Sequence, residues 1–87
     1  MQLEVTDTYA LDLEQPVFTV RGRLIGGTAR VGMTLRTSGG RAAPISRVAP
    51  APGRSTVAVD LVLRLSDRSE LDAWQLDVVT GAIATIE

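Results

Sequence analysis

The chain has 87 residues, of which 45% are hydrophobic and 22% are charged, and its formal net charge is −1. This composition is typical of a single globular domain over residues 1–87, and it excludes a disordered chain and a membrane span, because no apolar run approaches about 20 residues. Cysteine and histidine are absent, which excludes disulfides, thiolate or imidazole metal sites and the usual catalytic base. We therefore predict a protein that is not an enzyme and that binds no cofactor or metal.

The N-terminal segment, residues 1–16, contains four acidic residues and no basic residue. It lacks the basic start and the continuous apolar run of a signal peptide, so we predict a cytoplasmic protein without a membrane partner.

Apolar and polar residues alternate along much of the chain, which is the period of a half-buried β-strand. The predicted strands, in chain order, are residues 3–13, 18–24, 29–35, 43–48, 57–65 and 76–86. Gly26 and Gly27 separate the second strand from the third and favour a tight hairpin. Segments rich in glycine and proline at residues 36–44 and 49–56 predict turns. These elements predict an all-β fold, a small antiparallel closed barrel of six strands with one short helical turn.

The helical turn is predicted at residues 66–74. Asp67 and Glu70 approximate a capping box, and Trp74 at its end either anchors the helix on the barrel or is an exposed interaction residue. Capping and solvation explain Asp67, Glu70 and Asp72 better than a cation site does.

The charges are segregated along the chain. Residues 1–20 hold four acids and no base, residues 21–54 hold seven arginines and no acid, and residues 55–87 hold six acids and two arginines. One interpretation is that these segments neutralise each other across neighbouring strands. The other is that several arginines share one face and form a patch for a phosphate backbone or an acidic partner.

Three stretches, residues 3–11, 18–35 and 59–79, resemble the second, β-barrel domain of the elongation factor Tu type of translational GTPases. The matching positions are Asp7, Tyr9, Gly22, Gly27, Val31, Gly32, Leu35, Arg64 and the helical segment of residues 66–76. The chain departs from the family by a small insertion at residues 14–16, by Met33 in place of an acid and by Trp74 in place of a glycine. The bulky Trp74 side chain resists the positive φ that a glycine can adopt.

The resemblance covers only the barrel, so it implies a stand-alone module without GTPase activity of its own. The chain has no G-x-x-x-x-G-K-[ST] motif and no lysine, so we predict that it binds no nucleoside triphosphate. In the family this barrel helps to hold the acceptor end of an aminoacylated transfer RNA or contacts ribosomal RNA. Carried over, that role would fall to Asp7, Tyr9, Thr19, Arg21 and Arg64.

Two functions remain open. The first is a protein-interaction or regulatory module that pairs with a partner protein or with itself, which the acidic pI of about 5.3 favours. The second is an RNA-binding accessory module in translation that uses an arginine-lined barrel face. The candidate binding surface is Asp7, Tyr9, Thr19, Arg21, Arg23, Arg30, Arg36 and Arg64. Within it, Tyr9 is read as a core aromatic with its hydroxyl at the rim rather than a stacking platform, and Arg64 as a solvated outward residue.

Overall fold

The structure is a computed structural model that describes residues 1–50 and 58–87. Its elements are β1 (Gln2–Leu11), β2 (Val17–Ile25), β3 (Thr34–Arg36), β4 (Ala42–Pro44), β5 (Arg47–Pro50), β6 (Ala58–Arg64), α1 (Arg68–Asp77) and β7 (Ile83–Ile86). Val57, which the alternation assigned to a strand, and residues 51–56 of a predicted turn lie outside the described residues.

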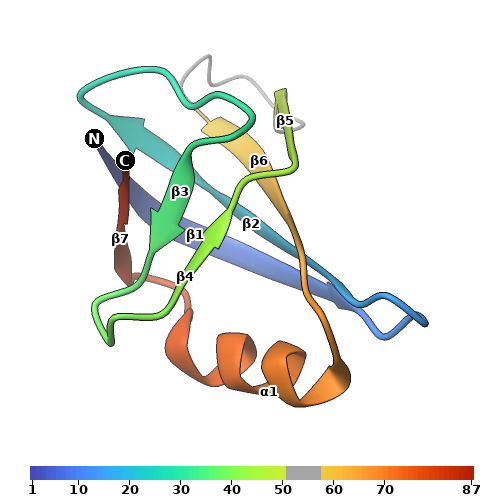
Figure 1. Ribbon diagram of the computed structural model, residues 1–87. Coiled ribbons are helices and arrows are strands. Elements are labelled where there is room, and N and C mark those ends of the chain that lie inside the picture. Colours follow the sequence, from blue (N-terminus) through green and yellow to red (C-terminus); the bar gives the residue numbers. More distant parts are fainter. Residues whose placement is uncertain (51–57) are drawn as a thin grey trace.

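The strands form one antiparallel sheet in the order β4-β3-β7-β1-β2-β6-β5. In the view of Figure 1, α1 lies below the strands. The prediction of an antiparallel, mainly β fold with one short helix is confirmed. The six-stranded closed barrel is not confirmed, because the sheet has seven strands and its order has two ends. The additional strand arises where the predicted strand 43–48 divides at Ile45 and Ser46. The part before the division, β4, pairs with β3, and the part after it, β5, pairs with β6.

β1 and β2 form a long hairpin whose register shifts between Val5 and Asp7. Gly22 lies opposite Val5, next to this bulge. A Cβ atom at position 22 would overlap the Glu4 carbonyl oxygen and lie 2.9 Å from Leu3 Cγ. Glycine therefore lets the two strands approach closely at the point where the sheet bends.

The predicted strand 29–35 is mostly wrong, because only Thr34–Arg36 is extended. The chain turns at Gly32, whose φ is +93°, and the Met33 N–H donates to the Arg30 carbonyl at 3.2 Å. Val31, which the alternation placed on the core side, is 64% exposed. The segment therefore forms a turn with Gly32 in the left-handed conformation, although its apolar and polar residues alternate as they would in a strand.

β7 is shorter than the predicted strand 76–86, because α1 continues to Asp77 and the chain turns at residues 78–82. It pairs with β1 on one side and with β3 on the other. β7 and β1 therefore lie between β2 and β3, and the hairpin predicted at Gly26 and Gly27 is wrong. The two strands that flank these glycines are not neighbours in the sheet.

α1 is longer than the one or two turns predicted, since it covers Arg68–Asp77. Asp67 caps it as predicted, because its Oδ1 accepts a hydrogen bond from the Glu70 N–H at 2.8 Å. The Glu70 carboxylate reaches back to Ser66, whose backbone N–H donates to it at 3.1 Å and whose hydroxyl also donates to it. The Asp67 and Glu70 side chains thus accept hydrogen bonds from backbone N–H groups at the start of α1.

Trp74 anchors α1 on the sheet, the first of the two alternatives that the sequence left open, and has no exposed surface. Its ring centroid lies 6.2 Å from that of Phe18 on β2, and the two rings are tilted by 44°. The other fully buried large side chains around this pair include Leu3, Val5, Val20, Leu35, Ile45, Leu61, Leu63 and Leu65. The core thus fills the inner side of the sheet, and the sheet's other side faces solvent.

Candidate functional site

Most of the predicted binding residues lie on the solvent side of four neighbouring strands, β1, β2, β6 and β5. We call this surface the outer face, and it consists of Glu4, Asp7, Tyr9, Leu11, Val17, Thr19, Arg21, Arg23, Arg47, Asp60, Val62 and Arg64. Strand geometry explains why they share a side. Phe18 and Val20 of β2 are fully buried, so the alternating residues Thr19 and Arg21 point outward.

The register places these side chains in rows across the sheet. One row runs Tyr9, Thr19, Val62, Arg47 over β1, β2, β6 and β5. Directly opposite residues have Cβ atoms about 4.5 to 5.5 Å apart, so each member of a row is in reach of its neighbours on the adjacent strands.

Two further rows flank the first one. The row toward the β1–β2 turn consists of Leu11, Val17 and Arg64, and the row on the other side consists of Asp7, Arg21 and Asp60. The outer face is therefore apolar and basic toward the hairpin tip, and it is acidic and ion-paired farther along the strands.

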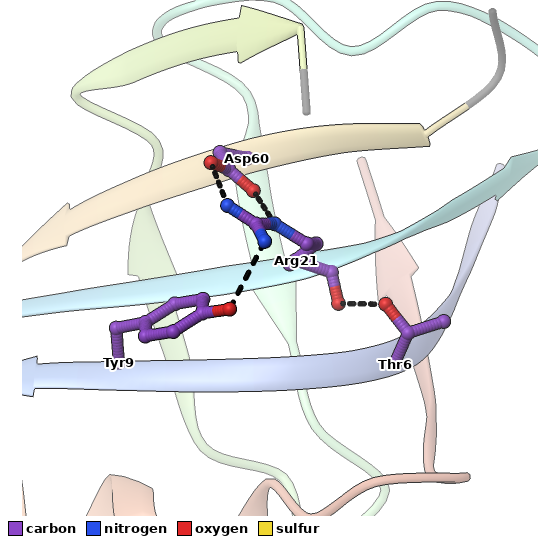
Figure 2. Close-up of polar contacts among 4 residues, drawn as sticks. All are labelled: Thr6, Tyr9, Arg21 and Asp60. Carbon is purple, nitrogen blue, oxygen red and sulfur yellow. Dashed lines mark hydrogen bonds and ion pairs between the residues drawn. The ribbon is translucent and has the colours of Figure 1, made fainter. Parts of the chain in front are cut away.

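Arg21 is the centre of the polar contacts on the outer face (Figure 2). Its Nε donates to Asp60 Oδ1 at 2.7 Å and its Nη2 donates to Asp60 Oδ2 at 3.0 Å, a two-point ion pair between β2 and β6. Its Nη1 donates to the Tyr9 hydroxyl at 3.0 Å, and its carbonyl oxygen accepts from the Thr6 hydroxyl at 3.2 Å. The hydrogen bond to Asp60 is the main cause that raises the pKa of Arg21 above its ordinary value.

Tyr9 does not occupy the core, which corrects the sequence interpretation. It is 44% exposed on the outer face, because the register shift near Thr6 turns it to the solvent side. The Arg21 guanidinium carbon lies 4.9 Å from the centre of the Tyr9 ring, a cation–π contact. One face of the ring is thus already covered by a side chain of the same molecule.

Other arginines are also paired with acids that are distant in sequence. Arg23 lies 3.5 Å from Glu4, Arg36 lies 3.3 Å from Glu87, Arg41 lies 3.0 Å from Asp77, and Arg68 lies 3.3 Å from Asp12. Arg23, Arg36 and Arg41 of the basic middle therefore pair with acids from both ends of the chain, whereas Arg68 and Asp12 both belong to the end segments. Of the two interpretations of charge segregation, the pairs agree with the first.

Arg47 and Arg64 differ from the arginines around them. Both are exposed, and neither forms an ion pair with a residue of the described ranges 1–50 and 58–87. Arg64 was expected to point outward. Arg47 was missed because the inward alternation shifts by one residue between Ile45, which is buried, and Val48, which packs against the core. Only the predicted strand 43–48 signalled that Arg47 could lie in the sheet.

Two of the eight predicted residues lie away from the outer face. Arg36 is on β3 and Arg30 is in the loop before it. The expectation that Arg30 and Arg36 lie on a strand adjacent to Arg21 and Arg23 fails, because β7 and β1 separate β3 from β2.

The outer face is an open surface. Within residues 1–50 and 58–87 there is no group of three or more acidic, histidine or cysteine side chains arranged to hold a metal ion, and no pocket is found in the same part of the chain. The one helix that the structure describes is too short and too polar to cross a membrane.

No protein-family model, no curated protein and no solved structure matches the chain. The resemblance to the second domain of elongation factor Tu type GTPases therefore rests on the sequence positions alone. Of those positions, Gly22 has a clear structural reason in the close approach of β1 and β2.

Proposed function

We propose that the chain is a non-catalytic protein-interaction or regulatory module whose binding surface is the outer face. One observation carries the proposal: Arg21 and Arg23 of this face are paired with acids of neighbouring strands, while the aliphatic side chain of Leu11, two rows from Arg21 on the same face, is exposed. Asp60 forms an ion pair with Arg21, and Glu4 forms one with Arg23. Leu11 is 55% exposed. A phosphate backbone bound at Arg21 and Arg23 would have to displace those carboxylates, whereas a protein can cover Leu11 without breaking either pair.

The partner in this proposal is another protein or a second copy of the chain. The charge pattern supports this choice, since nucleic-acid-binding domains are typically basic and this chain has a pI of about 5.3.

We also propose that the sheet is a barrel of the translation-factor type, in keeping with the resemblance in sequence. Support comes from Ile45 and Ser46, which join the two end strands of the sheet order. The Ile45 N–H donates to the Met33 carbonyl beside β3 at 2.8 Å, and the Ser46 N–H donates to the Val62 carbonyl of β6 at 2.8 Å. One short segment thus bonds to both sides, as closure of a sheet requires.

RNA binding is the second candidate function, and one observation favours it. Arg47 and Arg64 are exposed and near each other, and Tyr9 is exposed in the same region. Basic side chains next to an aromatic ring are the usual elements of a single-strand binding surface. The acids paired with Arg21 and Arg23 weigh against it.

A fluorescence-anisotropy titration separates the two candidates. The purified protein is titrated into labelled transfer RNA and labelled generic single-stranded RNA at two salt concentrations. The protein-interaction proposal predicts no binding to either RNA at tens of micromolar protein. Binding that weakens steeply with salt, and that is lost in the variant Arg47→Gln/Arg64→Gln but kept in Arg30→Gln, would overturn the proposal and establish the RNA module.

A further inference from the structure

We infer that the outer face binds an acidic peptide segment with aliphatic side chains, which it holds through Arg47 and Arg64 next to an apolar strip at Leu11. The inference rests on the proposed function, because it names the chemistry of the protein partner. Three features of the outer face carry it: two cations without an ion-pair partner in residues 1–50 and 58–87, a partly exposed aliphatic strip, and an acidic boundary that limits where an anion can lie.

The two cations are neighbours in the sheet. Arg47 of β5 lies opposite Val62 of β6, and Arg64 is two residues along β6 from Val62 on the same side. Diagonal positions of this kind are about 7 to 8 Å apart. Two like charges at this spacing repel each other, and neither forms an ion pair with an acid of the described residues. A carboxylate supplied by a partner would relieve the repulsion and accept charge-assisted hydrogen bonds.

The apolar strip lies directly beside these cations. Leu11 and Val17 form one row with Arg64, and Leu11 is 55% exposed while Val17 is half-buried. Val62, between Thr19 and Arg47 in the next row, is also half-buried. An aliphatic side chain of a partner would bury the exposed part of this strip, which a phosphate group or sugar could not do as favourably.

The boundary on the other side is acidic. Arg21 lies between Asp7 and Asp60 in the third row, so this row carries more negative than positive charge. An anionic ligand is thereby confined to the rows of Arg47 and Arg64, where it meets the aliphatic strip. The arrangement selects a segment in which acidic and aliphatic residues lie close together.

An acidic peptide fits this surface better than RNA does. The Arg21 guanidinium covers one face of the Tyr9 ring at 4.9 Å, so a base has only the other face on which to stack. The remaining side chains next to the two cations are aliphatic or hydroxyl-bearing and offer no second stacking platform.

The test uses the full chain and a fluorescein-labelled peptide of about eight residues that alternates glutamate and leucine, a length sufficient to cross four strands. The same peptide with lysine in place of glutamate, a peptide of glutamate alone and a single-stranded RNA serve as comparison probes. We expect the glutamate–leucine peptide to bind most tightly of the four. Amide NMR shifts on adding this peptide should map to β1, β2, β6 and β5 around Leu11, Val62 and Arg64.

Three variants locate the contact. The double variant Arg47→Gln/Arg64→Gln should weaken glutamate–leucine binding by at least about tenfold, since charge-assisted hydrogen bonds are lost. Leu11→Ser should weaken the same complex while leaving the glutamate-only peptide unchanged. Arg30→Gln is the matched control, because Arg30 is also exposed but lies outside the outer face, and it should leave affinity within about twofold. Circular dichroism of each variant establishes that the fold is intact.

The outcomes are distinguishable. If the lysine–leucine peptide binds as tightly as the glutamate–leucine peptide, or if Arg30→Gln weakens binding as much as the double variant does, the inference is wrong while the proposed function stands. If only the RNA binds, and the double variant abolishes that binding, both the inference and the proposed function are wrong. Self-association of the chain that the double variant abolishes, without peptide binding, would replace the acidic peptide with a second copy as the occupant and overturn the inference.

Discussion

Arg21 on β2 and Asp60 on β6 are 39 residues apart in sequence and form a two-point ion pair with distances of 2.7 and 3.0 Å. The pair sits in the middle of the outer face, and its side chains are only 26% and 18% exposed. Arg23 lies two residues from Arg21 on the same side of β2, opposite Glu4 of β1. These two residues form a looser pair at 3.5 Å, with side chains that are 55% and 43% exposed. The two pairs therefore provide a comparison of tight and loose ion pairing within one sheet.

The coupling free energy between Arg21 and Asp60 should exceed that between Arg23 and Glu4. Two-point geometry and partial shielding from water strengthen the first pair, while solvent screens the second. Double-mutant cycles with Arg21→Gln and Asp60→Asn, and with Arg23→Gln and Glu4→Gln, measured by urea unfolding, check this order. Equal coupling in the two cycles would show that the Arg21 contacts add nothing beyond surface ion pairing.

Substitution of Gly22 should destabilise the protein strongly. In Gly22→Ala the new methyl group would overlap the Glu4 carbonyl oxygen and crowd Leu3, so β1 and β2 would have to separate, at a cost of about 1 to 3 kcal/mol in the free energy of unfolding. Gly27→Ala is the control, because its methyl group would meet only the flexible Met1 side chain, with Met1 Sδ at 3.2 Å, and should change stability by less than about 0.5 kcal/mol. Urea denaturation followed by circular dichroism compares the two, and an unchanged midpoint for Gly22→Ala would contradict the close approach.

Removal of the Trp74 ring should cost more than any surface substitution on α1. Trp74 is fully buried against Phe18, so Trp74→Ala should lower the free energy of unfolding by about 3 to 5 kcal/mol. Trp74→Phe keeps most of the contact with Phe18 and should fall between Trp74→Ala and the unmodified protein. Leu76→Ala, at a position that is 82% exposed, should change the free energy by less than about 0.5 kcal/mol. Unfolding is followed by circular dichroism, because the Trp74 variants lack the only tryptophan of the chain and therefore its fluorescence signal.

The start of α1 should respond to acid through Glu70. The Ser66 hydroxyl and backbone N–H donate to its carboxylate and lower the pKa of Glu70 below its ordinary value. Because the pKa is lower in the folded than in the unfolded state, the contribution of Glu70 to stability is present above the unfolded pKa of about 4.3 and is lost as the pH falls through the folded value. An NMR titration of the Glu70 carboxyl carbon should place its pKa below the ordinary value.

Substitution of Ser66 tests the cause of that shift. Ser66→Ala removes the hydroxyl donor and should move the pKa of Glu70 back toward its ordinary value, although not completely, since the backbone N–H remains. Ser69→Ala, at an exposed serine of α1, should leave the Glu70 titration unchanged. A Glu70 titration that is identical in Ser66→Ala and the unmodified protein would show that the hydroxyl does not set the pKa.

The sequence predicted the elements whose pattern is local and regular. β1, β2 and β6 follow from alternation of apolar residues, and the capping role of Asp67 follows from the spacing to Glu70. Prediction failed where a single residue interrupts a regular pattern. Gly32 turns the chain inside an alternating segment, and the shift after Ile45 divides one predicted strand into two.

The candidate site could be predicted only in part, because it depends on which strands become neighbours. Thr19 and Arg21 share the outer face as their spacing on β2 indicated, but Asp60 and Arg47 join them there from strands far along the chain. Sequence periodicity determines which side of a strand a residue faces, and it contains no information on the strand order. The position of Tyr9 was wrong for a related reason, since the register shift near Thr6 reverses the sides for the rest of β1.

Photo-crosslinking inside cells that produce the protein tests the central claim, that the outer face contacts protein, most directly. A photoreactive phenylalanine analogue replaces Leu11 on the outer face in one sample, and in a control sample it replaces Val31, which is also an exposed aliphatic residue but lies in the loop before β3. The account predicts adducts from position 11 that resist nuclease, are destroyed by protease, and are absent or much weaker from position 31. Adducts from position 11 that disappear on nuclease treatment, or equal protein adducts from both positions, would contradict it.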